Sequence, residues 1–358
     1  MMMHALSDFD LPALEAQLAH WGIKTAHARP LLRHYYDASG NMDYAQLDSA
    51  RFGRSALARL IDDLPPRQSR VVRRVASNDG TVKLLVEFTG GGAVECVLMP
   101  ALRSGRAAGC VSSQIGCAMG CDFCASTLAG MQRNLWPGEI VEQYLHLRQE
   151  AAQAGRRLNT LVFMGMGEPM HNLPNVMAAI RRIAQPETGA LGWRQITLST
   201  VGIVPGMDEL AQSGLNVHLA LSLHAPDDAT RSRLIPVNRR WPVEQVMAAA
   251  RRYQQITGRV PTIEYCLIDQ VNDSDAQAQA LAQLMQGFRA HVNLIPYNPI
   301  AATLSGAVYR RPDAPRVWRF LHLLHAGGVV AHVRRPRGDD VSAACGQLAA
   351  DARGTPQG

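Results

Sequence analysis

The sequence has no uninterrupted apolar run near the ~18–20 residues that a membrane-spanning helix requires, so no membrane span or membrane partner is expected. Its first residues also lack a secretory-signal pattern, because Asp8 and Asp10 come early and no apolar stretch follows them. The chain contains no internal repeat and no low-complexity tract, which excludes a repeat architecture. We therefore expect a cytoplasmic protein.

Cysteine is scarce, and its distribution is informative. The odd total and one tight group argue against a secreted disulfide scaffold and fit a reducing compartment, where an oxygen-sensitive metal cluster persists. The seven cysteines are Cys96, Cys110, Cys117, Cys121, Cys124, Cys266 and Cys345.

Length and charge set further bounds. The 358 residues suit a barrel of ~200–250 residues with an appendage, and the 47% of hydrophobic residues can fill a sizeable core. The net charge of +6 fits a nucleic-acid partner, although an ordinary solvated surface explains it equally well.

Cys117, Cys121 and Cys124 form the tight group, with spacings that let one loop turn all three sulfurs toward a common point. Thiolates are the usual ligands of iron–sulfur clusters, and three of them leave one iron open to bind a substrate or cofactor. A zinc site would need a fourth Cys or His nearby, and a redox pair of Cys121 and Cys124 would leave Cys117 unexplained. The Cx3Cx2C spacing resembles the signature of radical SAM enzymes, in which the open iron binds S-adenosylmethionine.

The first part of the chain predicts two small units. Residues 1–75 show helical periodicity, for example at Leu14 and Leu18, and are predicted to form an N-terminal helical domain. Residues 76–106 change to a strand pattern around three glycines at 90–92, which predicts a β-hairpin extension. The helical unit ends in a basic cluster that could contact phosphates or could be an exposed linker face; its members are Arg67, Arg70, Arg73 and Arg74.

From residue 107 to 350, strand-like and helix-like segments alternate, which predicts parallel strands joined by crossover helices. Six or seven such units predict an α/β fold, an incomplete (β/α)6-type TIM barrel with its site at the carboxyl ends of the strands. Residues 351–358 are expected to be a disordered tail. The expected strands are 107–113, 159–164, 195–199, 215–221, 261–267, 291–296 and 329–334, and the expected helices are 138–154, 174–185, 205–213, 243–257, 274–286 and 313–326.

Polar residues follow several of these strands. Gly167 and Glu168 lie past the second strand, Ser199 ends the third, and His224 follows the fourth. Singly, such residues are most often turn formers, but several on one rim favour a ligand pocket. Cys345 lies in a late small-residue loop and could be a fourth cluster ligand or an inert thiol.

Taken together, these motifs resemble the RlmN/Cfr family of radical SAM adenosine methyltransferases, most closely its RlmN branch, over residues 76–350. The matching segments are CVSSQIGC at 110–117, the cysteine group, GMGEP at 165–169, LST at 198–200, SLHAP at 222–226, NLIPYNP at 293–299, RGDD at 337–340 and AACGQL at 343–348.

The resemblance implies a role for each of these positions. Cys117, Cys121 and Cys124 would hold one 4Fe–4S cluster. Cys345 would become an S-methylcysteine intermediate, Glu95 would accept a proton, and Cys110 would release the product by forming a disulfide with Cys345. S-adenosylmethionine would be bound by Gly167, Glu168, Ser199, Ser222, Leu223, His224 and Asn298.

The implied activity is methylation of carbon 2 of an adenosine in 23S ribosomal RNA, and in transfer RNA for RlmN-type members, with two S-adenosylmethionine molecules per turnover. A reducing electron donor such as flavodoxin or ferredoxin is implied, and a monomer is expected. The alternatives are a Cfr-like methylation at carbon 8, or an RNA-binding protein with a structural metal site. Cys96 and Cys266 receive no role and are expected to be buried strand cysteines.

Overall fold

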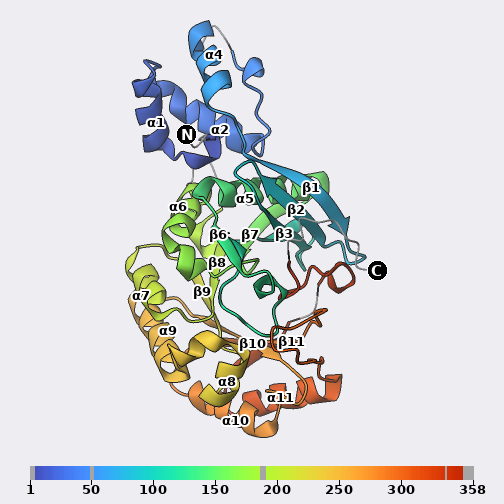
Figure 1. Ribbon diagram of the computed structural model, residues 1–358. Coiled ribbons are helices and arrows are strands. Elements are labelled where there is room, and N and C mark those ends of the chain that lie inside the picture. The colour runs from blue at the N-terminus through green and yellow to red at the C-terminus, as the bar shows by residue number, and fades with distance from the viewer. Residues whose placement is uncertain (1–4, 49–51, 186–190, 335–336, 350–358) are drawn as a thin grey trace.

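A computed structural model describes residues 5–48, 52–185, 191–334 and 337–349, in which N-terminal helices stand at one end of a large curved sheet (Figure 1). The predicted tail at 351–358 lies outside the described residues. Among the described residues, none of the helices combines the length and apolarity required to cross a membrane.

The N-terminal region contains the expected helices α1 (Leu11–His20), α2 (Ala28–Asp37) and α4 (Arg54–Asp63). The Asp10 side chain caps α1 by accepting a hydrogen bond from the Ala13 N–H at 2.9 Å. Helix α2 is amphipathic and buries Tyr35 and Tyr36 against its neighbours. The region therefore has an apolar core that is continuous with the rest of the molecule.

Strand β1 (Ser69–Ala76) corrects the prediction that the helical region extends to residue 75. The β-branched residues Val71, Val72 and Val75 favour an extended backbone, and the strand pairs with β2 (Val82–Phe88) along its length. Strands β2 and β3 (Ala93–Pro100) form the expected hairpin. The boundaries of separate domains stay a prediction.

The basic cluster is largely engaged with the protein itself. Arg70 binds Glu87 at 2.8 Å, and Arg74 binds Glu150 at 2.6 Å. Arg67 donates a hydrogen bond to His146 at 3.1 Å. Arg73 is exposed, and among the described residues no ion pair of it is found, although its charge lowers the pKa of Glu95.

The remaining strands of the large sheet, β4 and β7 to β12, are parallel and confirm the predicted incomplete barrel. The sheet has the order β1-β2-β3-β4-β7-β8-β9-β10-β11-β12, and within the described ranges β1 and β12 each pair with one neighbour, so it does not close. Its parallel strands are β4 (Arg106–Cys110), β7 (Arg157–Phe163), β8 (Ile196–Thr200), β9 (His218–Ser222), β10 (Thr262–Leu267), β11 (His291–Pro296) and β12 (Val330–Val333).

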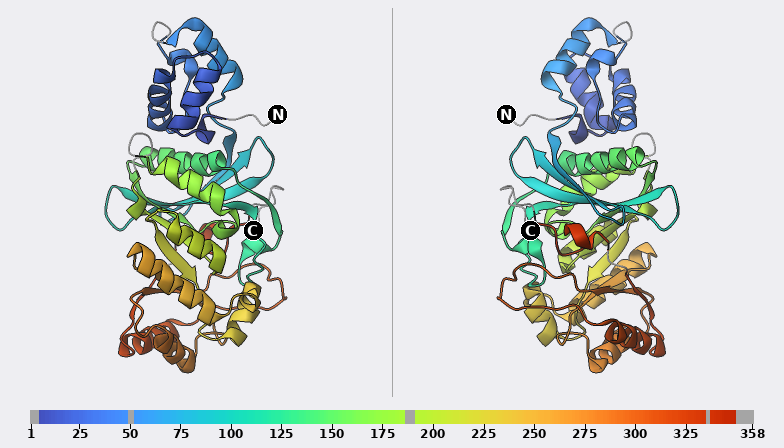
Figure 2. Two further views of the ribbon diagram at one scale, coloured as in Figure 1. Left: turned by 90° about the vertical axis from the view of Figure 1, so that its left-hand side faces the viewer. Right: turned by 90° about the vertical axis from the view of Figure 1, so that its right-hand side faces the viewer.

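Helices connect these strands and cover one side of the sheet, whereas the C-terminal segment lies on the other side (Figure 2). Helix α8 and a short sheet of β5 (Gln114–Gly116) and β6 (Met131–Asn134) were not predicted. The helices are α5 (Pro137–Gln153), α6 (Leu173–Ile183), α7 (Val204–Gln212), α8 (Asp228–Leu234), α9 (Val243–Thr257), α10 (Asp275–Leu284) and α11 (Ala314–Ala326).

Candidate active site

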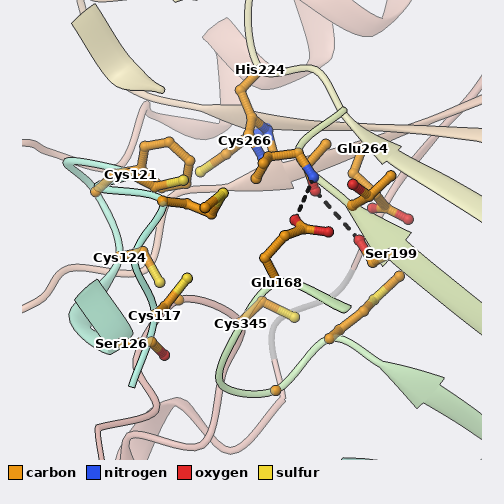
Figure 3. A pocket seen from close by; sticks show the side chains of 18 of the residues that line it. Cys117, Cys121, Cys124, Ser126, Glu168, Ser199, His224, Glu264, Cys266 and Cys345 are labelled. Carbon is orange, nitrogen blue, oxygen red and sulfur yellow. Dashed lines mark hydrogen bonds between the residues drawn. The ribbon is translucent and has the colours of Figure 1, made fainter. Parts of the chain in front are cut away.

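A cavity opens at the carboxyl ends of the parallel strands, the edge at which this architecture places ligands. It encloses about 940 Å³ of space free of protein atoms, part of it open to solvent. Cys117, Cys121 and Cys124 border it, across from Glu168 and Ser199 (Figure 3). The structure thus brings the three cysteines and most of the predicted cofactor residues into one space.

Hydrogen bonds from the Thr127 side chain and to the end of helix α8 hold the loop that carries the three cysteines. The Thr127 hydroxyl donates to the carbonyls of Cys121 and Cys124 at 3.2 and 2.9 Å. The Asp122 N–H donates to the Leu234 carbonyl at the end of α8, at 3.0 Å. These bonds fix the cysteine positions through main-chain atoms and leave the thiols facing the cavity.

Asp122, between the second and third cysteines, anchors the loop to the segment before α11. Its carboxylate accepts hydrogen bonds from the Ser305 N–H at 2.8 Å, the Ser305 hydroxyl at 2.6 Å and the Tyr309 hydroxyl at 2.6 Å. Burial alone would raise the pKa of Asp122, but these hydrogen bonds lower it below its usual value. The carboxylate is therefore charged and orders the loop.

The donor set around this space suits an iron–sulfur cluster, because the ligands of such clusters are usually cysteine thiolates and three of them border one cavity. Burial raises the pKa of Cys117 to about 12 and also raises the pKa values of Cys121 and Cys124, so their thiolates would be stabilised by a cationic partner.

Glu168 lies in the turn after β7, where glycine allows a close backbone approach. A Cβ on Gly167 would lie 2.6 Å from the Gln114 Cβ, and its φ of +97° also disfavours other residues. The Glu168 carboxylate accepts hydrogen bonds from the N–H groups of Met170 at 3.0 Å and Val201 at 2.9 Å. Burial outweighs these bonds and raises the pKa of Glu168 to about 7.

Ser199 is the residue before the last of β8 and Ser222 ends the neighbouring strand β9, with their hydroxyl oxygens 3.4 Å apart. The ring of His224 packs edge-on against Phe123 of the cysteine loop, and its Nδ1 accepts a hydrogen bond from the Cys266 N–H at 2.9 Å. Burial lowers the pKa of His224 to about 3, so this ring is neutral.

Leu223 is completely buried, and its side chain does not border the cavity. Any contact of Leu223 with a cofactor would therefore involve its backbone. The Leu223 carbonyl is held by Arg231, whose Nε donates to it at 3.0 Å. Arg231 also donates to the Val201 carbonyl at 2.5 Å, so one buried guanidinium joins the ends of β8 and β9.

The loop around Cys345 packs directly on the cysteine loop. The Ala125 N–H donates to the Gly346 carbonyl at 2.7 Å, and the Ser126 hydroxyl donates to the Leu348 carbonyl at 2.6 Å. Cys345 itself borders the cavity (Figure 3). The structure thus places this thiol beside the proposed cluster site, about 220 residues away in sequence.

Cys345 also borders a second cavity, of about 520 Å³, together with Cys110 and Asn298. Burial raises the pKa of Cys110 to about 12, and the nearby Cys345 adds to this shift. Both thiols are free. Asn298 lies here and not at the first cavity; its side-chain N–H donates to the Cys345 carbonyl at 3.2 Å.

Glu95 does not border either cavity. It lies in a neighbouring hollow, where it pairs with Lys83 at 3.0 Å and accepts a hydrogen bond from the Ala349 N–H at 2.9 Å. Burial raises the pKa of Glu95, and Lys83 opposes this shift.

Three residues that the sequence did not indicate also border the first cavity: Cys266, Glu264 and Arg334. Cys266 was expected to be a strand cysteine without a role. It faces the same space as Glu264 because the two residues are two positions apart on β10, and such residues point to the same face of a sheet. Arg334 follows β12 and borders both cavities. The alternation of side chains along a strand could have predicted that Cys266 and Glu264 lie together. Arg334 comes close to them only through the tertiary fold.

Comparisons with known proteins agree with this geometry. The model of the radical SAM superfamily matches residues 111–281. A protein of Opitutus terrae named "Probable dual-specificity RNA methyltransferase RlmN 1" is 49% identical over 98% of this chain and 98% of its own. "Dual-specificity RNA methyltransferase RlmN" of Syntrophobacter fumaroxidans is 41% identical over 97% of this chain and 98% of its own. The crystal structure of a radical SAM methyltransferase from Sphaerobacter thermophilus superposes with a TM-score of 0.91 and 44% identity, covering 97% of this chain and 100% of its own.

Proposed function

Because this chain belongs to the RlmN family of RNA methyltransferases within the radical SAM superfamily, we propose that it methylates carbon 2 of an adenosine in RNA through a methyl carrier at Cys345. The family's cofactors are a 4Fe–4S cluster and S-adenosylmethionine. The observation that carries the proposal is the position of Cys345, which borders both the cavity of the three cysteines and the cavity of Cys110.

We assign the cluster to Cys117, Cys121 and Cys124, whose thiols face one space. Together, the cluster and S-adenosylmethionine supply a 5′-deoxyadenosyl radical that can remove a hydrogen atom from a methyl group.

Residues of the strand ends opposite the cysteines would position S-adenosylmethionine. Glu168 offers a buried carboxylate to its amino group, and Ser199 and Ser222 offer hydroxyls at adjacent strand ends. Gly167 lets the ligand approach the backbone, while His224 borders the cavity as a neutral ring. Leu223 and Asn298 would contribute through the backbone and through the loop of Cys345, respectively.

Cys345 would accept the methyl group that adenine cannot take directly from S-adenosylmethionine. Carbon 2 of adenine is electrophilic and does not attack the cationic methyl group of S-adenosylmethionine, whereas a thiolate does. The Cys345 sulfur would form the new S–CH3 bond as the sulfonium–carbon bond breaks. Hydrogen removal from this S-methyl group would then give a carbon radical that adds to carbon 2 of the adenine, which must leave its stack to reach a buried site. The adduct would have to give up one electron, which the cluster could take back, and the proton of carbon 2.

Cys110 would resolve the product. It borders the same small cavity as Cys345, so its thiolate can attack the Cys345 sulfur. The S–S bond would form as the bond from the Cys345 sulfur to the RNA-bound carbon breaks, and that carbon would take the electron pair and then a proton to become the methyl group. Proton removal by Glu95 stays a prediction, as do an external electron donor such as flavodoxin or ferredoxin, a monomeric state and cytoplasmic localisation. The RNA substrates proposed are 23S ribosomal RNA and transfer RNA.

Anaerobic reconstitution followed by incubation with S-adenosylmethionine, reductant and RNA tests the function. We expect about four iron atoms per chain, formation of 5′-deoxyadenosine, and 2-methyladenosine in the digested RNA. Zinc in place of iron with no cofactor cleavage would contradict the proposal, and 8-methyladenosine would support the Cfr-like alternative instead.

A further inference from the structure

The segment from Ser342 to Ala349 carries Cys345 and is attached to the β2–β3 hairpin near both of its ends. The Lys83 ammonium donates to the Ser342 carbonyl at 3.0 Å. The Glu95 carboxylate accepts from the Ala349 N–H at 2.9 Å. These contacts join two parts of the chain that are more than 250 positions apart in sequence.

Lys83 and Glu95 also bind each other, through Nζ and Oε1 at 3.0 Å. In the hairpin register Lys83 is opposite Val97 and Glu95 is opposite Leu85, so the two side chains are diagonal neighbours on one face. Their side chains are only 14% and 10% exposed. Removing one partner from such a pair leaves a poorly solvated charge, which costs far more than breaking a surface pair.

Both oxygens of Glu95 are therefore occupied by structural partners, one by Lys83 and the other by a backbone N–H. The carboxylate does not border the cavity of the three cysteines or that of Cys110. A general base must come within hydrogen-bond reach of the proton that it removes. The observed contacts instead suit a residue that orients something else.

We propose that Lys83 and Glu95 together clamp the Ser342–Ala349 segment and thereby position Cys345 between its two cavities, an inference that rests on the proposed carrier role of Cys345. Lys83 fixes the segment before the cysteine and Glu95 fixes it after the cysteine. Asn298 holds the Cys345 carbonyl between them. Misplacement of a reacting group by about 1 Å can lower a rate by orders of magnitude, so loosening either end should impair methyl transfer and resolution alike.

The variants Lys83→Met and Glu95→Gln, and the two combined, remove the ion pair. Lys83→Arg preserves a cation that can reach the same acceptors and serves as the conservative rescue. The matched control is Glu87→Gln, which breaks the pair with Arg70 on the neighbouring strands and does not touch the segment.

Hydrogen exchange of residues 342–349 and alkylation of Cys345 by iodoacetamide, read by peptide mass spectrometry on the reconstituted holoenzyme, report the order of the segment. In Lys83→Met and Glu95→Gln we expect both rates to rise by about tenfold or more, which corresponds to about 1.4 kcal/mol in the opening equilibrium. Alkylation of the fully buried Cys96 should not change, which shows that the fold is intact. The double variant should resemble each single variant, and Lys83→Arg should restore slow exchange and RNA methylation.

Two outcomes would overturn the clamp. One is unchanged exchange and methylation in Lys83→Met together with loss of methylation in Glu95→Gln, which would make Glu95 a proton acceptor. The other is failure of Lys83→Arg to restore slow exchange when Cys96 shows an intact fold. Failure of the proposed function looks different: wild-type protein would not methylate RNA, while the exchange differences among the variants would persist.

Discussion

Asp122 shows at the scale of one residue how the cysteine loop is ordered. Its carboxylate binds Ser305 and Tyr309, and hydrogen bonds to a charged group each contribute about 1.5–3 kcal/mol. We expect Asp122→Ala to lose iron several-fold faster than wild type during dialysis against a chelator, measured as iron per chain. Asp208→Ala, which removes a surface pair with Arg252, serves as the control, and equal iron loss in both variants would contradict this role.

Gly167 is a second single position with a defined physical constraint. An added methyl group would clash with Gln114 at 2.6 Å, in addition to the strain of about 1 kcal/mol or more that a positive φ imposes. Gly167→Ala should therefore weaken binding of S-adenosylmethionine at least about tenfold, because the turn that carries Glu168 must shift. Equilibrium binding to the reconstituted protein measures this effect.

The control for Gly167→Ala is Gly155→Ala. Gly155 also has a positive φ, of +65°, but nothing lies within 4 Å of the position that an added methyl group would occupy. Its substitution should reduce stability slightly and leave cofactor binding unchanged. Equal loss of binding in the two variants would show that general destabilisation, and not the clash, is responsible.

At the scale of elements, His146 joins helix α5 to strand β1 and the N-terminal region. Arg67 donates to its Nδ1 at 3.1 Å, so the proton of the neutral ring is on Nε2, which donates to the Ser69 hydroxyl at 3.0 Å. Burial, reinforced by the Arg67 charge, lowers the pKa of His146 from 6.5 to about 3. The folded protein therefore keeps this ring neutral in mild acid.

This depressed pKa has a defined consequence for stability. Below about pH 6.5 the unfolded chain binds a proton at His146 that the folded chain does not, so stability present above that pH is lost as pH falls, by up to about 1.4 kcal/mol per pH unit. In urea unfolding, His146→Gln should lose less stability than wild type between pH 6.5 and 5. Equal acid sensitivity of His146→Gln and wild type would contradict the assignment.

The elements that the sequence predicted were those with strong periodicity. Parallel strands buried on both faces, such as β8 and β10, and amphipathic helices such as α9 carry clear local patterns. Strand β1 was missed because its alternation is obscured by exposed valines and arginines, and its pairing with β2 decides its conformation. Helix α8 is too short to show a helical period.

At the scale of the whole molecule, the structure brings together those predicted site residues that belong to local motifs or strand ends. The cysteine group, Glu168 and Ser199 do border one cavity. The contacts of Lys83 and Arg334 were not predictable, because both depend on the C-terminal segment returning to the hairpin and the barrel. The register of the hairpin strands and the path of the C-terminal segment, not the composition of the chain, determine these neighbours.

The net charge of +6 gives a prediction for RNA binding by the whole protein. We expect contacts mainly to phosphates, with the folded shape of the RNA providing selection. The logarithm of the binding constant should then fall steeply and linearly with the logarithm of salt concentration, in a filter-binding or anisotropy titration. Arg73→Gln should reduce this slope more than substitution of the engaged Arg74, and a flat salt response would contradict the prediction.

The fate of RNA in cysteine variants tests the methyl-carrier mechanism most directly. With Cys110→Ala, Cys345 should still be methylated and the methyl carbon should still add to adenine, but no thiol remains to release it. We therefore predict a covalent protein–RNA adduct at Cys345 in Cys110→Ala, detected by denaturing gel and mass spectrometry, and none in the double variant with Cys345→Ala. The Cys345→Ala protein should retain its iron, because the proposed ligands are Cys117, Cys121 and Cys124. Normal turnover of Cys110→Ala without an adduct, or loss of iron in Cys345→Ala, would contradict the mechanism.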